Sequence, residues 1–247
     1  MKFLKAALCL FGLMGVPCAV SQTTGGAATL QVSVRDTQGQ PLAGAQVRYR
    51  RVVQTVRAGG QVVLAPGEAW VDGQVAADAG GAFSPANLPV GDYMLCASVP
   101  SAPYLDPCVW RQAVRATVSA ATAAIPTLTL EKGVFLKVRI NDPLRLLPQG
   151  VEGPWTPRKL LVGVMYANGA YQGAQNTGAD AAGRDYQLVI PAGTAFKLWL
   201  FSTDIALTDA TGNAVGTSGA QIPFQAAAGQ DQVFTFTVSG LAKASPL

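Results

Sequence analysis

The sequence predicts an all-β protein made of two tandem antiparallel Greek-key β-sandwich domains, and three observations support this. The 247 residues include 27 glycines and 16 prolines but only 13% charged residues, a composition that favours short strands and turns over helices. Many short segments alternate apolar and polar residues, as half-buried strands do. A pattern of turn, corner and strand occurs twice, 102 residues apart. We therefore expect two related domains of about 100 residues, each able to bury its own core.

The repeated pattern is clearest in residues 77–99, ADAGGAFSPANLPVGDYMLCASV. It begins with a glycine turn, where positive φ costs little. A corner follows, in which proline fixes φ and glycine lets the chain reverse direction, and then an apolar strand. The second copy keeps one offset throughout: Asp78 matches Asp180, Pro89 matches Pro191, and Gly91 matches Gly193.

The first 21 residues have the features of a signal peptide. A basic start precedes an apolar segment, residues 6–16, that is too short to span a bilayer as a helix. Small residues suit cleavage after Ser21. We therefore expect a secreted or periplasmic protein without an integral membrane anchor, because no other stretch is apolar for about 20 residues. The alternative is a lipoprotein anchored through Cys18, for which the preceding Pro17 is a poor fit.

Cysteine usage is consistent with export. Cys9 and Cys18 lie in the signal peptide and leave with it, so Cys96 and Cys108 remain as an even pair in an oxidising compartment. We expect these two to form a disulfide. The alternative is a pair of buried free thiols.

The charge balance does not indicate a nucleic-acid partner. Removal of Lys2 and Lys5 with the signal peptide leaves 16 basic and 14 acidic residues, a net charge of +2. Arg48, Arg50 and Arg51 form a small cluster, which a solvated strand face explains at least as well as a binding site.

The first domain is expected at residues 29–131, after a flexible leader at 22–28. TLQVSVRD at the start alternates well, and GG at 59–60 predicts a hairpin inserted between two β-rich pieces. Prolines make 100–107 a loop or an extended segment. In order, the expected strands cover residues 29–36, 45–53, 54–57, 61–64, a short segment at Phe83, 93–99, 109–118 and 127–132, and residues 70–77 lead into the repeated pattern.

The second domain is expected at residues 132–240, followed by a C-terminal tail at 241–247. VFLKVRI parallels the first strand of the first domain, and Asn168-Gly169 is a strong hairpin signal. We expect long loops at 144–157 and 208–219, which are rich in turn-forming residues. In order, the expected strands cover residues 134–140, 159–166, 170–172, the repeat at 180–202, 222–225 and 233–238.

A set of short motifs in the first domain keeps a characteristic order: VSVRD at 32–36, Gly39, PLAGA at 41–45, Val47, Asp78, GG at 80–81, Phe83 and LPVGDY at 88–93. This set resembles the carboxypeptidase regulatory-like domain, a prealbumin- (transthyretin-) like β-sandwich. The second domain carries only the weaker half of the pattern. The resemblance implies an accessory, non-catalytic extracellular module with a carbohydrate-binding-like fold, and it permits sugar binding without showing it.

The residues needed for the commonest catalytic sites are missing from the sequence. It contains no histidine, the commonest general base and metal ligand, so a Ser-His-Asp or Cys-His site cannot be built. The alternatives are lysine-based or paired-carboxylate chemistry, but the acidic residues are scattered singly, and no Asp-x-Asp calcium loop occurs. We therefore expect no enzyme activity, no catalytic residue, no metal site and no cofactor.

Aromatic residues are the binding candidates. Tyr104 and Trp110 flank the expected disulfide loop, and Trp70 precedes the repeated pattern. Trp155, in a Gly-Pro-Trp-Thr-Pro loop, is the expected exposed ring of the second domain. Rings on constrained loops can stack on a sugar or a partner side chain, whereas the alternative for Trp70 and Trp110 is that they fill the core. Trp199 alternates with leucines and is expected to pack.

Two functions are compatible with these observations. The first is a structural and protein-interaction module of the cell envelope, which binds an envelope or extracellular protein, or itself, through an exposed edge strand. The second is a carbohydrate-binding module that uses the loop aromatics to hold a glycan. The fold alone does not decide between them.

Overall fold

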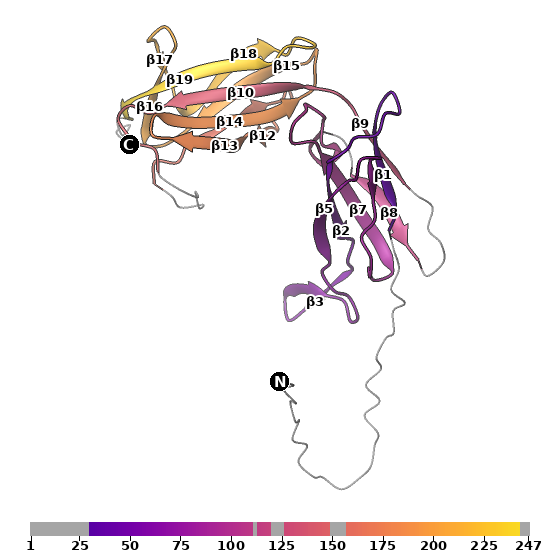
Figure 1. Cartoon of the computed structure of the whole chain (residues 1–247). Coiled ribbons are helices and arrows are strands. Elements are labelled where there is room, and N and C mark those ends of the chain that lie inside the picture. Colours follow the sequence, from indigo (N-terminus) through magenta and orange to yellow (C-terminus); the bar gives the residue numbers. More distant parts are fainter. Residues whose placement is uncertain (1–29, 111–112, 120–125, 149–156, 243–247) are drawn as a thin grey trace, which may run out of the picture.

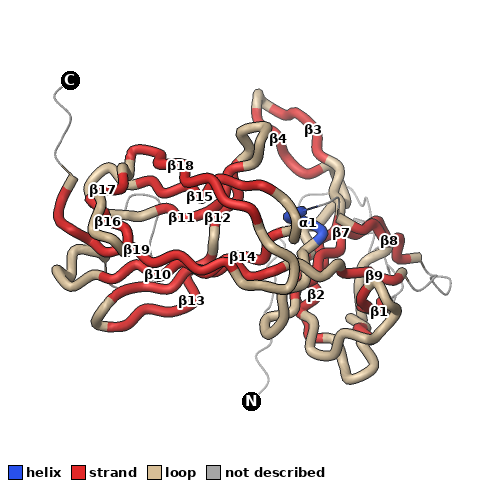
Figure 2. Tube along the Cα trace, turned by 90° about the horizontal axis from the view of Figure 1, so that it is seen from above, coloured by secondary structure: helices blue, strands red, loops and turns tan. Residues whose placement is uncertain are grey.

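The protein folds almost entirely as β-strands in two sandwiches (Figures 1 and 2). The computed structural model describes residues 30–110, 113–119, 126–148 and 157–242. The expected signal peptide with its cleavage site, the whole of the expected leader at 22–28, and Trp155 lie outside these ranges. In the described part, no helix is long and apolar enough to cross a membrane.

The first sandwich packs a three-stranded sheet, in the order β6-β1-β9, against a four-stranded sheet, in the order β5-β2-β7-β8, and carries a separate hairpin, β3-β4. In chain order its elements are β1 (Val32–Asp36), β2 (Gln46–Arg51), β3 (Thr55–Ala58), β4 (Gln61–Leu64), β5 (Asp72–Ala76), β6 (Ala82–Phe83), β7 (Gly91–Ser98), α1 (Pro107–Trp110), β8 (Val114–Val118) and β9 (Thr127–Leu130).

The second sandwich pairs a six-stranded sheet, in the order β13-β14-β10-β19-β16-β17, with a four-stranded sheet, in the order β12-β11-β15-β18. In chain order its strands are β10 (Val134–Asn141), β11 (Leu161–Met165), β12 (Tyr171–Gly173), β13 (Gln175–Asp180), β14 (Gly183–Ile190), β15 (Ala195–Phe201), β16 (Ile205–Asp209), β17 (Ala214–Val215), β18 (Ser218–Gln225) and β19 (Gln232–Leu241).

Alternation along the strands builds a separate core in each sandwich. In β7 every second side chain, Tyr93, Leu95 and Ala97, is completely buried. Strand β10 buries its own alternate residues in the second core. Each large aliphatic side chain that is fully removed from water contributes about 1.5–3 kcal/mol of transfer free energy. The two clusters share no buried residue, so each sandwich has its own hydrophobic centre.

The sequence analysis predicted antiparallel sheets, but each sandwich also contains a parallel pair of strands. In each sandwich the first strand pairs in parallel with the last one: β1 with β9, and β10 with β19. The alternation of apolar residues determines which face of a strand is buried, but it does not determine the direction of the neighbouring strand. The same parallel pairing in both sandwiches agrees with two related units.

Three local expectations were wrong. Residues 107–110, at the start of the strand expected at 109–118, form the single helical turn α1. The loop expected at 208–219 contains the end of β16, all of β17 and the start of β18. Strand β13 was not expected, because its sequence, QNTGAD, is polar and its residues are mostly exposed.

The repeated pattern occupies equivalent places in the two sandwiches. The Asp78 and Asp180 carboxylates each accept backbone N–H bonds in the turn before β6 or β14. Strands β6 and β14 then pair antiparallel with β1 and β10. At the corner of the first copy the Tyr93 hydroxyl donates to the Pro89 carbonyl oxygen at 2.9 Å, which ties the buried ring to the turn.

Gly81 is expected to be intolerant of any side chain. Its φ is +75°, and a Cβ would lie 2.5 Å from the Val34 carbonyl oxygen and 3.1 Å from the Leu42 nitrogen, both backbone atoms. Gly81→Ala should therefore lower the free energy of unfolding by about 3 kcal/mol, from the strained φ and the overlap together. Gly39→Ala is the matched control, because φ is +80° there and no atom lies within 4 Å. It should cost only about 1 kcal/mol. Equal losses in urea denaturation would contradict the close packing at Gly81.

Candidate functional site

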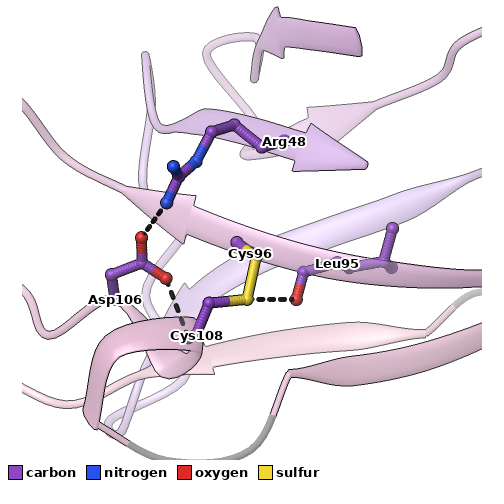
Figure 3. Close-up of a disulfide and its surroundings, with 5 residues drawn as sticks. All are labelled: Arg48, Leu95, Cys96, Asp106 and Cys108. Atoms are coloured by element: carbon purple, nitrogen blue, oxygen red, sulfur yellow. Dashed lines mark hydrogen bonds and ion pairs between the residues drawn. A yellow bond between two sulfur atoms is a disulfide. The ribbon is translucent and has the colours of Figure 1, made fainter. Parts of the chain in front are cut away.

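The predicted disulfide is present and closes a short loop on the first sandwich (Figure 3). Cys96 lies on β7 and Cys108 on α1, with their Cα atoms 5.4 Å apart and 12 positions apart in the sequence. The Cys108 sulfur also lies 3.6 Å from the Leu95 carbonyl oxygen. Because a disulfide sulfur has no hydrogen to donate, this is a packing contact. The bond therefore holds α1 directly against β7.

Asp106 positions α1. One carboxylate oxygen accepts the Cys108 N–H at 2.9 Å, and the Asp106 carbonyl oxygen accepts the N–H groups of Val109 and Trp110 at 3.0 Å each. This is the arrangement of a helix N-cap. The other carboxylate oxygen pairs with the Arg48 guanidinium of β2 (Figure 3). Half of the Arg48 side chain is exposed, so this pair contributes orientation more than stability.

The loop before α1 also binds the connection between the two sandwiches. The Leu105 N–H donates to the Glu131 carbonyl oxygen at 2.9 Å, and the Gly133 N–H donates to the Pro103 carbonyl oxygen at 2.7 Å. At Gly133 a Cβ would overlap the carbonyl oxygen of Ile190 in the second sandwich and would lie 2.9 Å from Leu105 Cδ2. The chain thus passes between the two sandwiches in close contact with both.

Trp110, the last residue of α1, packs into the second sandwich. Its ring centroid lies 5.3 Å from that of Tyr166 and 5.9 Å from that of Phe196, and the two receiving rings lie 5.9 Å from each other. All three pairs are tilted or edge-on, the geometries that aromatic rings prefer. We call residues 103–110 and 131–133, together with Tyr166 and Phe196, the interdomain clasp.

Of the other predicted binding residues that the structure describes, Tyr104 belongs to the clasp and Trp70 does not. Tyr104 is half-buried against the first core and forms an isolated β-bridge with Lys132. Trp70 is 63% exposed and follows Ala69, whose carbonyl oxygen contacts Arg51 at the end of β2. Trp199 is half-buried and stacks on Phe201. Binding of a ligand by Tyr104, Trp110, Trp155 or Trp70 therefore stays a prediction.

Sequence reasoning missed the rings that receive Trp110. Tyr166 and Phe196 lie 56 and 86 positions beyond Trp110 in another sandwich, Tyr166 directly after β11 and Phe196 on β15. Periodicity places Phe196 inside, because it alternates with exposed Ala195 and Lys197, but it does not indicate which side chain covers it. The one signal in the sequence was that Trp110 lies two positions after Cys108. A disulfide at Cys108 restricts the directions in which nearby side chains can point.

A groove lies on the outer face of the β5-β2-β7-β8 sheet, beside the disulfide. It has a volume of about 460 Å³ and is lined by Arg48, Tyr49, Arg50, Asp72, Gly73, Gln74, Met94, Cys96, Cys108 and Val109. The floor of the groove combines charged and uncharged side chains, because Met94 lies opposite Arg50 in the strand register and Cys96 lies opposite Arg48. The arginine cluster that the sequence analysis assigned to a solvated strand face thus borders this groove through two of its members.

The titratable groups with shifted pKa values do not form a reactive centre. Burial raises the pKa of the Tyr93, Tyr166, Tyr171 and Tyr186 hydroxyls, so these groups stay protonated at neutral pH. Hydrogen bonds from Arg139 lower the pKa of Asp180, and one from Thr211 lowers that of Asp209. Such carboxylates stay ionised. In the described ranges no resolved shift therefore brings a pKa toward 7, where acid–base catalysts work best.

The described residues contain one group with metal-ligand spacing: Cys96, Asp106 and Cys108, whose ligand atoms lie within 4.8 Å of one another. Both cysteines are joined in the disulfide and offer no thiolate, the form that binds metals. The two cysteines of this group therefore serve to link α1 covalently to β7.

Comparisons with known proteins show a distant structural likeness. No protein-family model and no curated protein matches the sequence. Similar solved structures include a streptococcal ancillary pilin (14% identity, TM-score 0.39, covering 87% of this chain and 63% of that one). The TIE protein of Bacillus anthracis (12%, 0.33, 86% and 34%) and a minor pilin of Streptococcus agalactiae (10%, 0.33, 89% and 100%) are also similar. This chain thus spans about a third of TIE and less than two thirds of the ancillary pilin. With TM-scores below 0.5, the likeness carries no conclusion about function.

Proposed function

We propose that this chain is a non-catalytic structural and protein-interaction module of the cell envelope, secreted or periplasmic, in which two sandwiches are held as one rigid unit. The interdomain clasp is the observation that carries this proposal. Interfaces between domains of one chain usually allow relative motion unless they are large and apolar. Here a disulfide and a capped helical turn hold Trp110 in place against two rings of the second sandwich.

The same disulfide supports the proposed compartment. A bond of this kind persists in oxidising environments and is rare where thiols are kept reduced. This agrees with the signal peptide expected at residues 1–21. The resemblance of residues 29–131 to the carboxypeptidase regulatory-like domain also supports an accessory, non-catalytic role, and the second sandwich would then be a more divergent relative.

A protein partner is better supported than a glycan. Sugar recognition by the predicted aromatics would need several rings open to solvent on one surface. Trp110 is used in the clasp, and Tyr104 is half-buried against the first core. Among the described tryptophans, Trp70 is the one with an exposed side chain, and a single open ring is less than this kind of sugar recognition needs.

Fractionation of cells that express the whole chain tests this proposal. The mature chain should leave the cytoplasm, begin at Gln22, and show no reaction of Cys96 or Cys108 with an alkylating reagent until a reductant is added. A matched variant with Leu10→Arg and Leu13→Arg, which charges the apolar segment of the signal, should be retained in the cytoplasm with both thiols reactive. A wild-type chain that stays cytoplasmic with free thiols would overturn the proposal.

A further inference from the structure

The β3-β4 hairpin stands apart from the body of the first sandwich. Gly59 and Gly60, with φ of +57° and +81°, form its two-residue turn, the type I′ geometry that suits a hairpin. Figure 1 shows the hairpin below the first sandwich, at the end away from the second one. It forms a sheet of its own, tied at its base by the bond from the Ala65 N–H to the Gln54 carbonyl oxygen.

The hairpin presents apolar side chains to solvent. Val56, Val62 and Val63 are 44%, 64% and 39% exposed, and every residue of β3 is exposed. A two-stranded hairpin is marginally stable in water, and a third strand or a packed face is needed to hold it. Neither is present within the described part of the chain, so the hairpin is an incomplete sheet.

The free edge of β4 has a definite hydrogen-bonding pattern. Antiparallel partners alternate between pairs that exchange hydrogen bonds and pairs that do not. The bond between Ala65 and Gln54 makes theirs a bonded pair, so the next bonded pair is Val63 with Val56. The peptide groups of Val62 and Leu64 therefore point away from β3, toward solvent.

We propose that a second copy of this chain pairs with that edge, β4 against β4, antiparallel about a two-fold axis at Val63. In this register Val62 of each copy faces Leu64 of the other copy, so all the outward peptide groups of β4 find partners. The result is a continuous sheet in the order β3-β4-β4-β3. On one face the Val56 and Val63 side chains of both copies form a single apolar cluster.

The side chains of β4 favour a second copy as the occupant. Residues 60–65, GQVVLA, carry no charge, so two identical strands meet without repulsion. The edge also lacks the lysine or proline that commonly prevents such pairing. Strand β3 is less suitable, because self-pairing at its own edge would bring two copies of Arg57 onto one face. At the centre of the pairing, Val63 of one copy would face Val63 of the other copy, and both side chains would lie on the same face of the sheet.

This inference rests on the proposed function only in treating the chain as an interaction module, and it names the partner. The clasp and the β4 edge share no residue. A failure of the pairing would therefore leave the compartment and the rigidity of the two sandwiches untouched, and the two proposals fail separately.

Cysteine cross-linking tests the register. In the proposed pairing the two Val63 Cα atoms lie about 4.5 Å apart in a non-hydrogen-bonded pair, within disulfide range. Val63→Cys should therefore give a covalent dimer under mild oxidation. Val56→Cys is the matched control, with similar exposure on the same face of the hairpin. It lies three strand spacings, about 14 Å, from its counterpart, too far for a bond.

We expect Val63→Cys to dimerise at least about ten-fold faster than Val56→Cys, because pairing raises the effective concentration of its thiol. Peptide mapping should show the Cys96–Cys108 bond intact in both variants. Equal rates, or a Val63→Cys variant that stays monomeric, would overturn the proposal. In a second test, Val63→Lys should stay monomeric in sedimentation equilibrium at concentrations at which the wild type dimerises. At concentrations low enough for both proteins to be monomers, their thermal midpoints should be equal. Association of Val63→Lys as strong as that of the wild type would also overturn it.

Discussion

Replacement of both Cys96 and Cys108 by serine is expected to lower the free energy of unfolding of the first sandwich by about 3 kcal/mol, the chain-entropy value for a loop of this length. The bond joins two cysteines that lie 12 positions apart in the sequence, and it links the central strand β7 to α1. Without it, α1 depends on the Asp106 cap and the half-exposed Arg48 pair, and surface pairs of this kind contribute little. The loss should therefore extend to the position of Trp110.

Urea denaturation of the mature chain, followed by tyrosine and tryptophan fluorescence, measures this effect. Dithiothreitol should lower the wild-type midpoint to that of the Cys96→Ser, Cys108→Ser variant and should leave the variant itself unchanged. Ser101→Ala, an exposed substitution in the same loop, is the matched control and should alter stability by less than about 0.5 kcal/mol. If the double variant were as stable as the wild type, the disulfide would not be what holds the clasp.

Replacement of Trp110 by alanine is expected to uncouple the two sandwiches. The ring contacts Tyr166 and Phe196 at centroid distances of 5.3 and 5.9 Å, so its removal leaves a gap at the edge of the second core. Because Trp110 is only half-buried, the loss should lie near the low end for large-to-small changes, about 2–3 kcal/mol. Calorimetry should then resolve two unfolding transitions in the variant, whereas we expect one cooperative transition in the wild type.

Trp70→Ala provides the control for this experiment. Trp70 is 63% exposed and takes no part in the clasp, so its removal should leave a single transition and change stability by less than about 0.5 kcal/mol. Limited proteolysis offers a second measurement: cleavage at Glu131–Gly133 should accelerate in Trp110→Ala only. Two transitions already present in the wild type would contradict the coupling.

Much of the fold could be predicted from local patterns. Alternation of apolar and polar residues located β1, β9 and β19, because a strand with one buried face repeats every second residue. The Gly59-Gly60 pair located the β3-β4 hairpin, since both residues adopt positive φ there. Export and an even number of mature cysteines predicted the bond between Cys96 and Cys108.

Long-range features could not be predicted in this way. The parallel pairing of β1 with β9 joins segments that alternate equally well in either direction. Polar β13 is a strand because its neighbour β14 offers a free edge, and nothing in QNTGAD indicates that. The sequence placed Trp110 beside a disulfide, but the rings that bind it come from another sandwich. The clasp therefore became visible only in three dimensions.

The distance between one point on each sandwich tests the rigid clasp most directly. Spin labels attached at Val75→Cys on β5 and Val233→Cys on β19, both exposed positions, can be measured by double electron–electron resonance in the intact oxidised chain. Our account predicts one narrow distance distribution, which broadens when Trp110→Ala is added or the disulfide is reduced. A distribution that is already broad in the oxidised chain with Trp110 present would contradict it.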